Sequence, residues 1–115
     1  MDSINRSVAV IKPKQPLLDW LNALPDTDLP YMLADFQTDC TVLLLPEFDD
    51  DLQALKFIKK IYKGIFEKEL DSFCTDPEYW PSIRDYKTFL LWFDIELHSK
   101  VVDTVDKEII KERWE

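Results

Sequence analysis

The feature that most restricts this sequence is its near-total lack of glycine. The chain has 115 residues and one glycine, Gly64, where average usage of roughly 7% would give about eight. Glycine supplies the backbone angles of two-residue hairpin turns and allows main chain to approach a phosphate closely. The sequence therefore excludes a P-loop, a G-x-G-x-x-G nucleotide turn and a G-x-S-x-G nucleophile elbow, and no two-residue hairpin turn is recognisable in it.

Length and composition predict one domain over residues 1–115, because 46% hydrophobic and 13% aromatic residues are enough for a core. The first apolar run covers only Val8 to Ile11, too short for a signal-peptide core, and no run approaches the roughly 18 apolar residues of a membrane span. We therefore expect a cytoplasmic protein without a membrane segment. The two cysteines, Cys40 and Cys74, are expected to be free thiols, and no cofactor is expected.

Hydrophobic spacing and capping residues predict the order of elements. The sequence predicts an α/β or α+β domain, in which helices pack on a small sheet of about three strands, mixed or parallel. The strand at 40–45 is apolar on both faces and is expected to be the most buried one. The expected elements are strands at 7–12, 40–45 and 94–102, helices at 16–24, 31–36, 49–73 and from 82 onward, and a short helix or turn at 106–115.

Charge is distributed unevenly along the chain, whose formal net charge is −9. Residues 25–51 contain eight acids and no Lys or Arg, whereas residues 52–70 contain five lysines and two glutamates. Lys56, Lys60 and Lys63 share the helix face opposite the apolar stripe, which indicates a solvated surface or a contact face for an acidic partner. A nucleic-acid partner is not expected at this net charge, although the acidic segment itself could imitate nucleic acid.

The best chemical constellation is Asp94, Glu96 and His98, which alternate along a predicted strand and so share one face. Two carboxylates and an imidazole could bind a divalent metal or act as general acid and base. Alternate side chains lie about 6.6 Å apart, so the three would have to lean together. A solvated sheet face, or a histidine in a dimer contact, is the other interpretation.

Two further candidate sites depend on lysine and cysteine. Lys12 and Lys14 follow the first strand, where ligands of open α/β sheets bind, and could hold a carboxylate or phosphate. Cys74 lies in a loop and could pair with His98 as a nucleophile, whereas Cys40 begins an apolar strand where a buried thiol is inert.

Tryptophan is the remaining candidate for recognition. Trp20 fits the core stripe of its helix, whereas Trp80 and Trp92 are expected to be partly exposed. Exposed aromatic rings often anchor protein interfaces. The alternative interpretation is that these large rings cover the edge of the core.

Three segments carry a resemblance to a known family. NRSVAVIKPK at 5–14, LDWL at 18–21 and WFDIELHS at 92–99 resemble segments of a family of small acidic bacterial proteins that has no assigned function. The resemblance spans most of the chain and implies a bacterial source and a free-standing protein. It brings no established catalytic residues.

The function expected from the sequence is that of a non-enzymatic cytosolic protein-interaction module, with a homodimer through the open sheet face or an aromatic patch as one form of it. Two alternatives stay open. One is a small metal- or anion-dependent enzyme or ligand-binding protein that uses Asp94, Glu96 and His98, or Lys12 and Lys14. The other is an acidic inhibitor that imitates nucleic acid.

Overall fold

The main sheet has three strands and is antiparallel. The computed structural model describes residues 1–25, 27 and 30–114, so Asp26 and Asp28 of the acidic segment lie outside the described residues. The strands β2 (Ser7–Pro13), β3 (Thr41–Leu45) and β4 (Phe93–His98) lie in the order β3-β2-β4, and both outer strands run antiparallel to β2. The chain is a small α+β domain, and the expectation of a parallel or mixed sheet is wrong.

The connections explain why the sheet is antiparallel. The connection from β2 to β3 contains α1 (Gln15–Asn22) and the 3-10 helix η1 (Leu33–Phe36). It brings the chain back to the end of the sheet where β2 finishes, because Ile11 near the end of β2 pairs with Thr41 at the start of β3. The second contains α2 (Asp51–Phe73), the 3-10 helix η2 (Pro77–Tyr79) and α3 (Tyr86–Trp92), and it carries the chain from β3 to β4. These two strands run in the same direction, but β2 lies between them, so the helical crossover does not create a parallel pair.

The middle strand is the buried one. Ser7, Ala9, Ile11 and Pro13 of β2 are all buried, whereas β3 lies at the sheet edge. Because an edge strand has one neighbour and only one covered face, alternate side chains of β3 remain exposed. The expectation that 40–45 is the most buried strand is therefore wrong.

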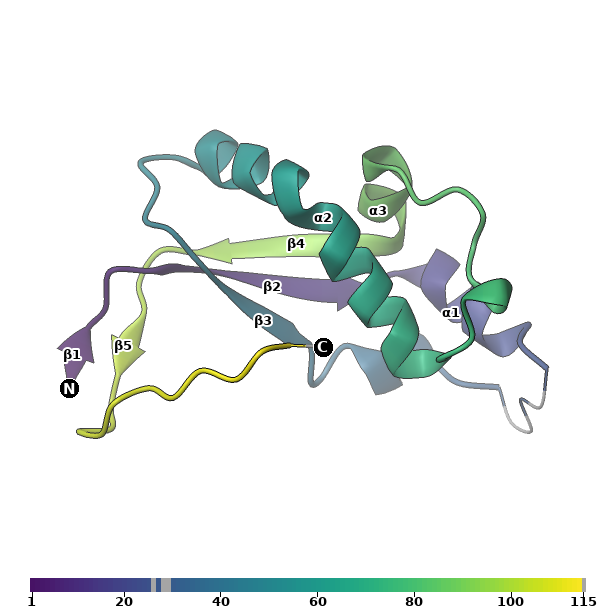
Figure 1. The fold of residues 1–115 in the computed structure, drawn as a ribbon, viewed down its shortest axis with the longest axis horizontal. Coiled ribbons are helices and arrows are strands. Elements are labelled where there is room, and N and C mark those ends of the chain that lie inside the picture. Colours follow the sequence, from purple (N-terminus) through teal and green to yellow (C-terminus); the bar gives the residue numbers. More distant parts are fainter. Residues whose placement is uncertain (26, 28–29, 115) are drawn as a thin grey trace.

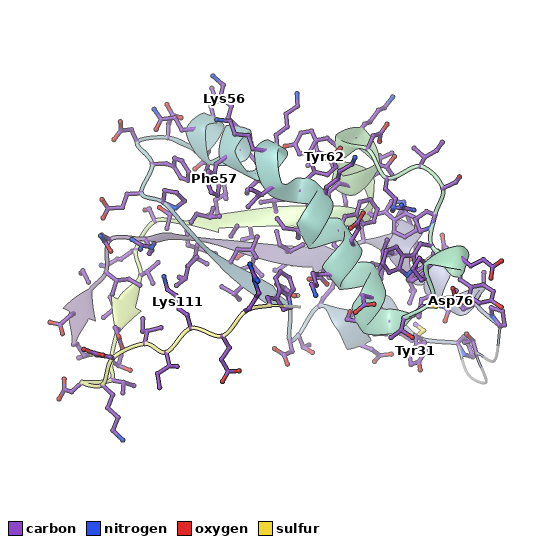
Figure 2. The ribbon with its side chains drawn as sticks, viewed as in Figure 1. Tyr31, Lys56, Phe57, Tyr62, Asp76 and Lys111 are labelled. Carbon is purple, nitrogen blue, oxygen red and sulfur yellow. The ribbon has the colours of Figure 1, made fainter. Side chains whose placement is uncertain are left out.

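The long helix α2 confirms the most strongly patterned prediction. Asp50 is its N-cap, and the Asp50 carboxylate accepts a hydrogen bond of 2.9 Å from the Gln53 N–H. The helix crosses one face of the sheet (Figure 1) and buries a stripe that includes Ile58 and Phe66. Lys56, Lys60 and Lys63 are exposed on its outer side, and Figure 2 shows Lys56 pointing away from the sheet.

The core is largely aromatic. The Phe66 ring centroid lies 5.7 Å from those of Phe89, Trp92 and Phe93, so one side chain of α2 contacts α3 and the start of β4. Trp20, Trp80 and Trp92 are half-buried and pack against this core. Helix α3 begins later than the expected start at Ser82, because Asp85 serves as its N-cap and accepts a hydrogen bond from the Thr88 N–H at 2.8 Å.

Two short strands, one at the N-terminus and one before the C-terminal tail, form a second, smaller sheet. The strands β1 (Asp2–Ser3) and β5 (Val102–Asp103) pair antiparallel. After them the tail runs back toward β3 (Figure 1) without forming a helix in its described part, 106–114. Of the two expected alternatives for this segment, a short helix or a turn, the helix is wrong there. Ile109 and Ile110 of the tail are 58% and 86% exposed, respectively, so neither is packed into the core. Glu112, Arg113 and Trp114 at the end of the described tail border β3.

Gly64 occupies an open position on α2. A glycine inside a helix indicates either a close packing contact or a weak point in the helix; a Cβ atom at this position would meet nothing within 4 Å, so the first of these alternatives is wrong. Gly64 instead borders a groove of about 550 Å³ beside Leu43 and Trp114. No helix in the described part of the chain has the length and apolar character needed to cross a membrane.

Candidate functional site on the open sheet face

The strand register brings two predicted candidate sites together. In the pairing of β2 with β4, Val8 lies opposite His98, Val10 opposite Glu96, and Lys12 opposite Asp94. These side chains point away from the helices, because the alternate residues of both strands form the core. We call this surface the open sheet face; its members are Val8, Val10, Lys12, Val42, Leu44, Asp94, Glu96 and His98, with Lys14 beside it.

Ion pairs connect the two predicted sets. Lys12 Nζ lies 2.7 Å from Glu96 Oε2, and His98 Nε2 lies 2.8 Å from Glu96 Oε1. At the strand end, Lys14 Nζ lies 3.9 Å from Asp94 Oδ1. Both oxygens of the Glu96 carboxylate are therefore engaged, and each lysine already faces a carboxylate.

These contacts shift two pKa values in opposite directions. The hydrogen bond from Lys12, followed by the hydrogen bond with His98 and then the positive charge of Lys12, lowers the pKa of Glu96. The same Glu96 carboxylate raises the pKa of Lys12. Because these side chains are substantially exposed, water and salt screen the attraction, and such pairs contribute little to stability.

The carboxylates and lysines of this surface are paired with one another. Within residues 1–25, 27 and 30–114, no group of three or more His, Cys, Asp and Glu side chains is placed to hold a metal ion. An anion at Lys12 or Lys14 would have to compete with Glu96 or Asp94. The metal and anion hypotheses stay predictions, and the observed chemistry is that of a charge-balanced, hydrogen-bonded surface.

The other half of the open sheet face is apolar. Val42 and Leu44 of the edge strand are 56% and 50% exposed, respectively, and they lie opposite Val10 and Val8 in the register. Sequence reasoning missed this strip because it placed 40–45 in the sheet interior.

The cysteines are free thiols that do not form the considered nucleophile pair. Cys74 is the C-cap of α2, whereas His98 borders the start of that helix near Asp51. A helix of 23 residues is about 35 Å long, which keeps Cys74 and His98 apart. Cys40 is half-buried and its Sγ lies 3.5 Å from the Phe36 carbonyl oxygen; burial raises the pKa of this thiol, which makes it less reactive.

One residue that the sequence analysis did not single out is Glu69. It is 7% exposed, and among the described residues its Oε1 atom has no hydrogen-bond partner. A sequence signal existed, since Glu69 lies four residues after Ile65 and three after Phe66 on the apolar stripe of α2.

We compared the chain with protein-family models, with curated proteins and with solved structures, and none of these three comparisons returned a match. The resemblance to small acidic bacterial proteins stays a prediction, and the functional proposal depends on the surface chemistry.

Proposed function

We propose that the chain is a protein-interaction module that forms a homodimer through the open sheet face. The observation that carries the proposal is the apolar strip, in which the strand residues Val42 and Leu44 are each at least half exposed. Apolar side chains on one side of a sheet are normally covered by another layer. A second copy of the face would supply that layer.

Charge balance favours a second copy as the occupant of this face. Each chain carries a net charge of −9, so two copies repel each other over most orientations. The open sheet face is an exception, because Lys12 and Lys14 match Glu96 and Asp94 one to one. Two copies that meet here bury apolar side chains without bringing unmatched negative charges together.

The size of the face sets the expected strength of the dimer. Its strands contain five to seven residues, and strands rise about 3.3 Å per residue and lie about 4.8 Å apart. Such a face is smaller than the roughly 800 Å² per partner of a standard interface. We therefore expect a dissociation constant in the micromolar range, about −8 kcal/mol or weaker.

The test is the molar mass in solution, measured by sedimentation equilibrium from about 10 to 500 μM, a range that brackets the expected constant. We expect the mass to rise from monomer toward dimer with concentration. Leu44→Lys should shift this rise to concentrations at least about tenfold higher, because it places a charge in the apolar strip.

Leu52→Lys is the matched control, because Leu52 is 71% exposed at the start of α2 and lies outside the open sheet face. A mass that stays monomeric over the whole range would overturn the proposal. So would a dimer that Leu44→Lys leaves intact, or one that Leu52→Lys weakens equally. Circular dichroism of each variant shows that the fold is retained.

A further inference from the structure

A cluster of four lysines lies on the outer side of α2, as Figure 2 shows for Lys56, which points away from the sheet. Residues three or four positions apart are neighbours on a helix surface, so these ammonium groups form one patch. With a rise of 1.5 Å per residue, the patch is about 10 Å long. We call it the lysine face; its members are Lys56, Lys59, Lys60 and Lys63, and all four are exposed.

The lysine face has no counter-charge of its own. Residues 52–66 contain four lysines and no Asp or Glu, in a chain with 23 acidic residues among 115. The ion pairs of the described residues all lie on the open sheet face or beside it, so none of the four ammonium groups has a described carboxylate oxygen within 4.0 Å. The nearest acids along α2 are Asp51 and Glu67, one at each end of this stretch. The patch is therefore a local excess of positive charge on an acidic protein.

This arrangement is unfavourable for the helix that carries it. Like charges three or four residues apart repel each other, and Lys56 has such a neighbour in both Lys59 and Lys60. The helix dipole favours cations in the last turn, but α2 has no basic residue there. Neither the helix nor an ion pair offsets the repulsion within the lysine face, whereas an acidic partner would.

An aromatic ring of α3 holds one end of this surface in place. Lys59 Nζ lies 5.6 Å from the ring centroid of Tyr86, which is a cation–π distance. Tyr86 is half-buried and its ring centroid lies 5.3 Å from that of Tyr62 of α2. The ring leaves the charge of Lys59 intact while restricting its side chain, so less conformational entropy is lost when this ammonium group meets a carboxylate.

We propose that the lysine face binds an extended acidic segment of another protein. Alternate side chains of an extended chain lie about 6.6 Å apart, so a segment of about six residues reaches along the whole patch. Such a segment stays near the four lysines, within roughly a Debye length of 8 Å. A nucleic-acid duplex needs an interface of about 1,000 Å² or more, over which the net charge of −9 repels its phosphates.

The lysine face and the open sheet face lie on opposite sides of the sheet. Helix α2 covers one side of the sheet (Figure 1) and carries the lysine face on its outer surface, whereas the open sheet face is the side without helices. A homodimer through the open sheet face would leave the lysine face of each copy exposed. Binding of the acidic segment therefore does not depend on the dimer, and each proposal can fail without the other.

The test is a titration with an acetylated, amidated hexa-aspartate peptide, followed by the ¹H–¹⁵N NMR signals of residues 52–66. We expect a dissociation constant of about 0.1–1 mM at low salt, weakened about threefold or more at 300 mM NaCl because salt screens exposed charges. The double variant Lys56→Gln with Lys60→Gln should weaken binding about fivefold or more. Because glutamine is a good helix former and the change removes like-charge pairs, this variant should be at least as stable as the wild type in urea.

The matched control is the double variant Lys107→Gln with Lys111→Gln. It removes the same total charge from two exposed tail residues outside the lysine face, and it should change the dissociation constant by less than about twofold. A hexa-asparagine peptide, which is neutral, should not bind. A thymidine hexanucleotide should bind at least about threefold more weakly than hexa-aspartate.

Several results would overturn the proposal. They are a wild type whose signals do not shift up to about 5 mM hexa-aspartate, shifts that lie only outside residues 52–66, and equal weakening by the two double variants. A hexanucleotide that binds as tightly as the peptide would give the face to nucleic acid. Self-association that Lys56→Gln with Lys60→Gln abolishes and Leu44→Lys leaves intact would give it to the acidic segment of a second copy. A double variant at 56 and 60 that is less stable than the wild type would contradict the repulsion from which the proposal starts.

Discussion

Lys12 and Glu96 lie on adjacent antiparallel strands and form an ion pair, with 2.7 Å between Nζ and Oε2. In the sequence they belong to two separate candidate sites, 84 residues apart by their numbers 12 and 96. In the folded chain each supplies the counter-charge of the other. The result is a charge-balanced strip in a protein of net charge −9.

Lys12→Met should raise the pKa of Glu96 toward its ordinary value, because Lys12 is the main cause of the lowered pKa. A carboxyl with a lowered folded-state pKa stabilises the fold above its unfolded-state pKa, and this contribution is lost as pH falls through the folded-state pKa. The variant should therefore lose less stability from Glu96 on acidification. The measurement is a ¹³C NMR titration of the Glu96 carboxyl.

Lys14→Met is the control for this titration, since Lys14 faces Asp94 at 3.9 Å instead of Glu96. The pKa of Glu96 should change little in it. An unchanged Glu96 pKa in Lys12→Met would show that the ion pair does not persist in solution. High salt should reduce the difference between wild type and Lys12→Met.

Gly64→Ala should stabilise the protein by roughly 0.5–1 kcal/mol, because glycine is a poor helix former and alanine the best one. The added methyl group meets nothing within 4 Å, so no steric penalty opposes the gain. Urea unfolding measures the difference. The opposite change at the neighbouring exposed position, Lys63→Gly, should lower the free energy of unfolding by a similar amount. A Gly64→Ala variant that is less stable than the wild type would contradict the open position described for Gly64.

Glu69→Gln should stabilise the protein at neutral pH by roughly 1 kcal/mol, because it removes the charge of a buried carboxylate whose Oε1 atom has no hydrogen-bond partner among the described residues. Burial raises the pKa of Glu69 above its ordinary value of 4.5, and the Thr41 side chain offsets part of this shift.

The sign of the pH dependence follows from that raised pKa. The folded state holds the Glu69 proton more tightly than the unfolded state, so the contribution of Glu69 to stability is largest below its unfolded-state pKa and is lost as pH rises through the folded-state pKa. The advantage of Glu69→Gln should therefore be present at pH 7 and shrink toward pH 4. Chemical unfolding of both proteins over this range measures it, and a pH-independent difference would count against a buried, titrating Glu69.

The elements that could be predicted are those with local causes. Asp50 caps α2 through Gln53, three residues further along the chain, and the stripe from Ile58 to Leu70 repeats at helical spacing. Cap and period can both be recognised within a short window of sequence. The predicted start of α3 at Ser82 is too early, because the residue that caps this helix is Asp85, whose carboxylate accepts a hydrogen bond from the Thr88 N–H.

The sites were predictable only in part. The alternation of Asp94, Glu96 and His98 correctly places them on one face, but their partner Lys12 depends on the register between β2 and β4. Glu69 shows the same limit, because its neighbours Asp35 and Thr41 come from a distant segment. Spacing along a strand or helix indicates the direction of a side chain and does not identify what lies across from it.

The sequence by itself determined the long capped helix, the wet face of the last strand of the main sheet and the exclusion of glycine-dependent nucleotide and hydrolase loops. The tertiary structure decided the antiparallel order β3-β2-β4, the exposure of Val42 and Leu44, the pairing of Lys12 with Glu96 and the burial of Glu69. The physical reason is the range of the interactions. Propensity, capping and backbone angles act within a few residues, whereas strand neighbours, burial and ion pairs depend on which distant segments meet.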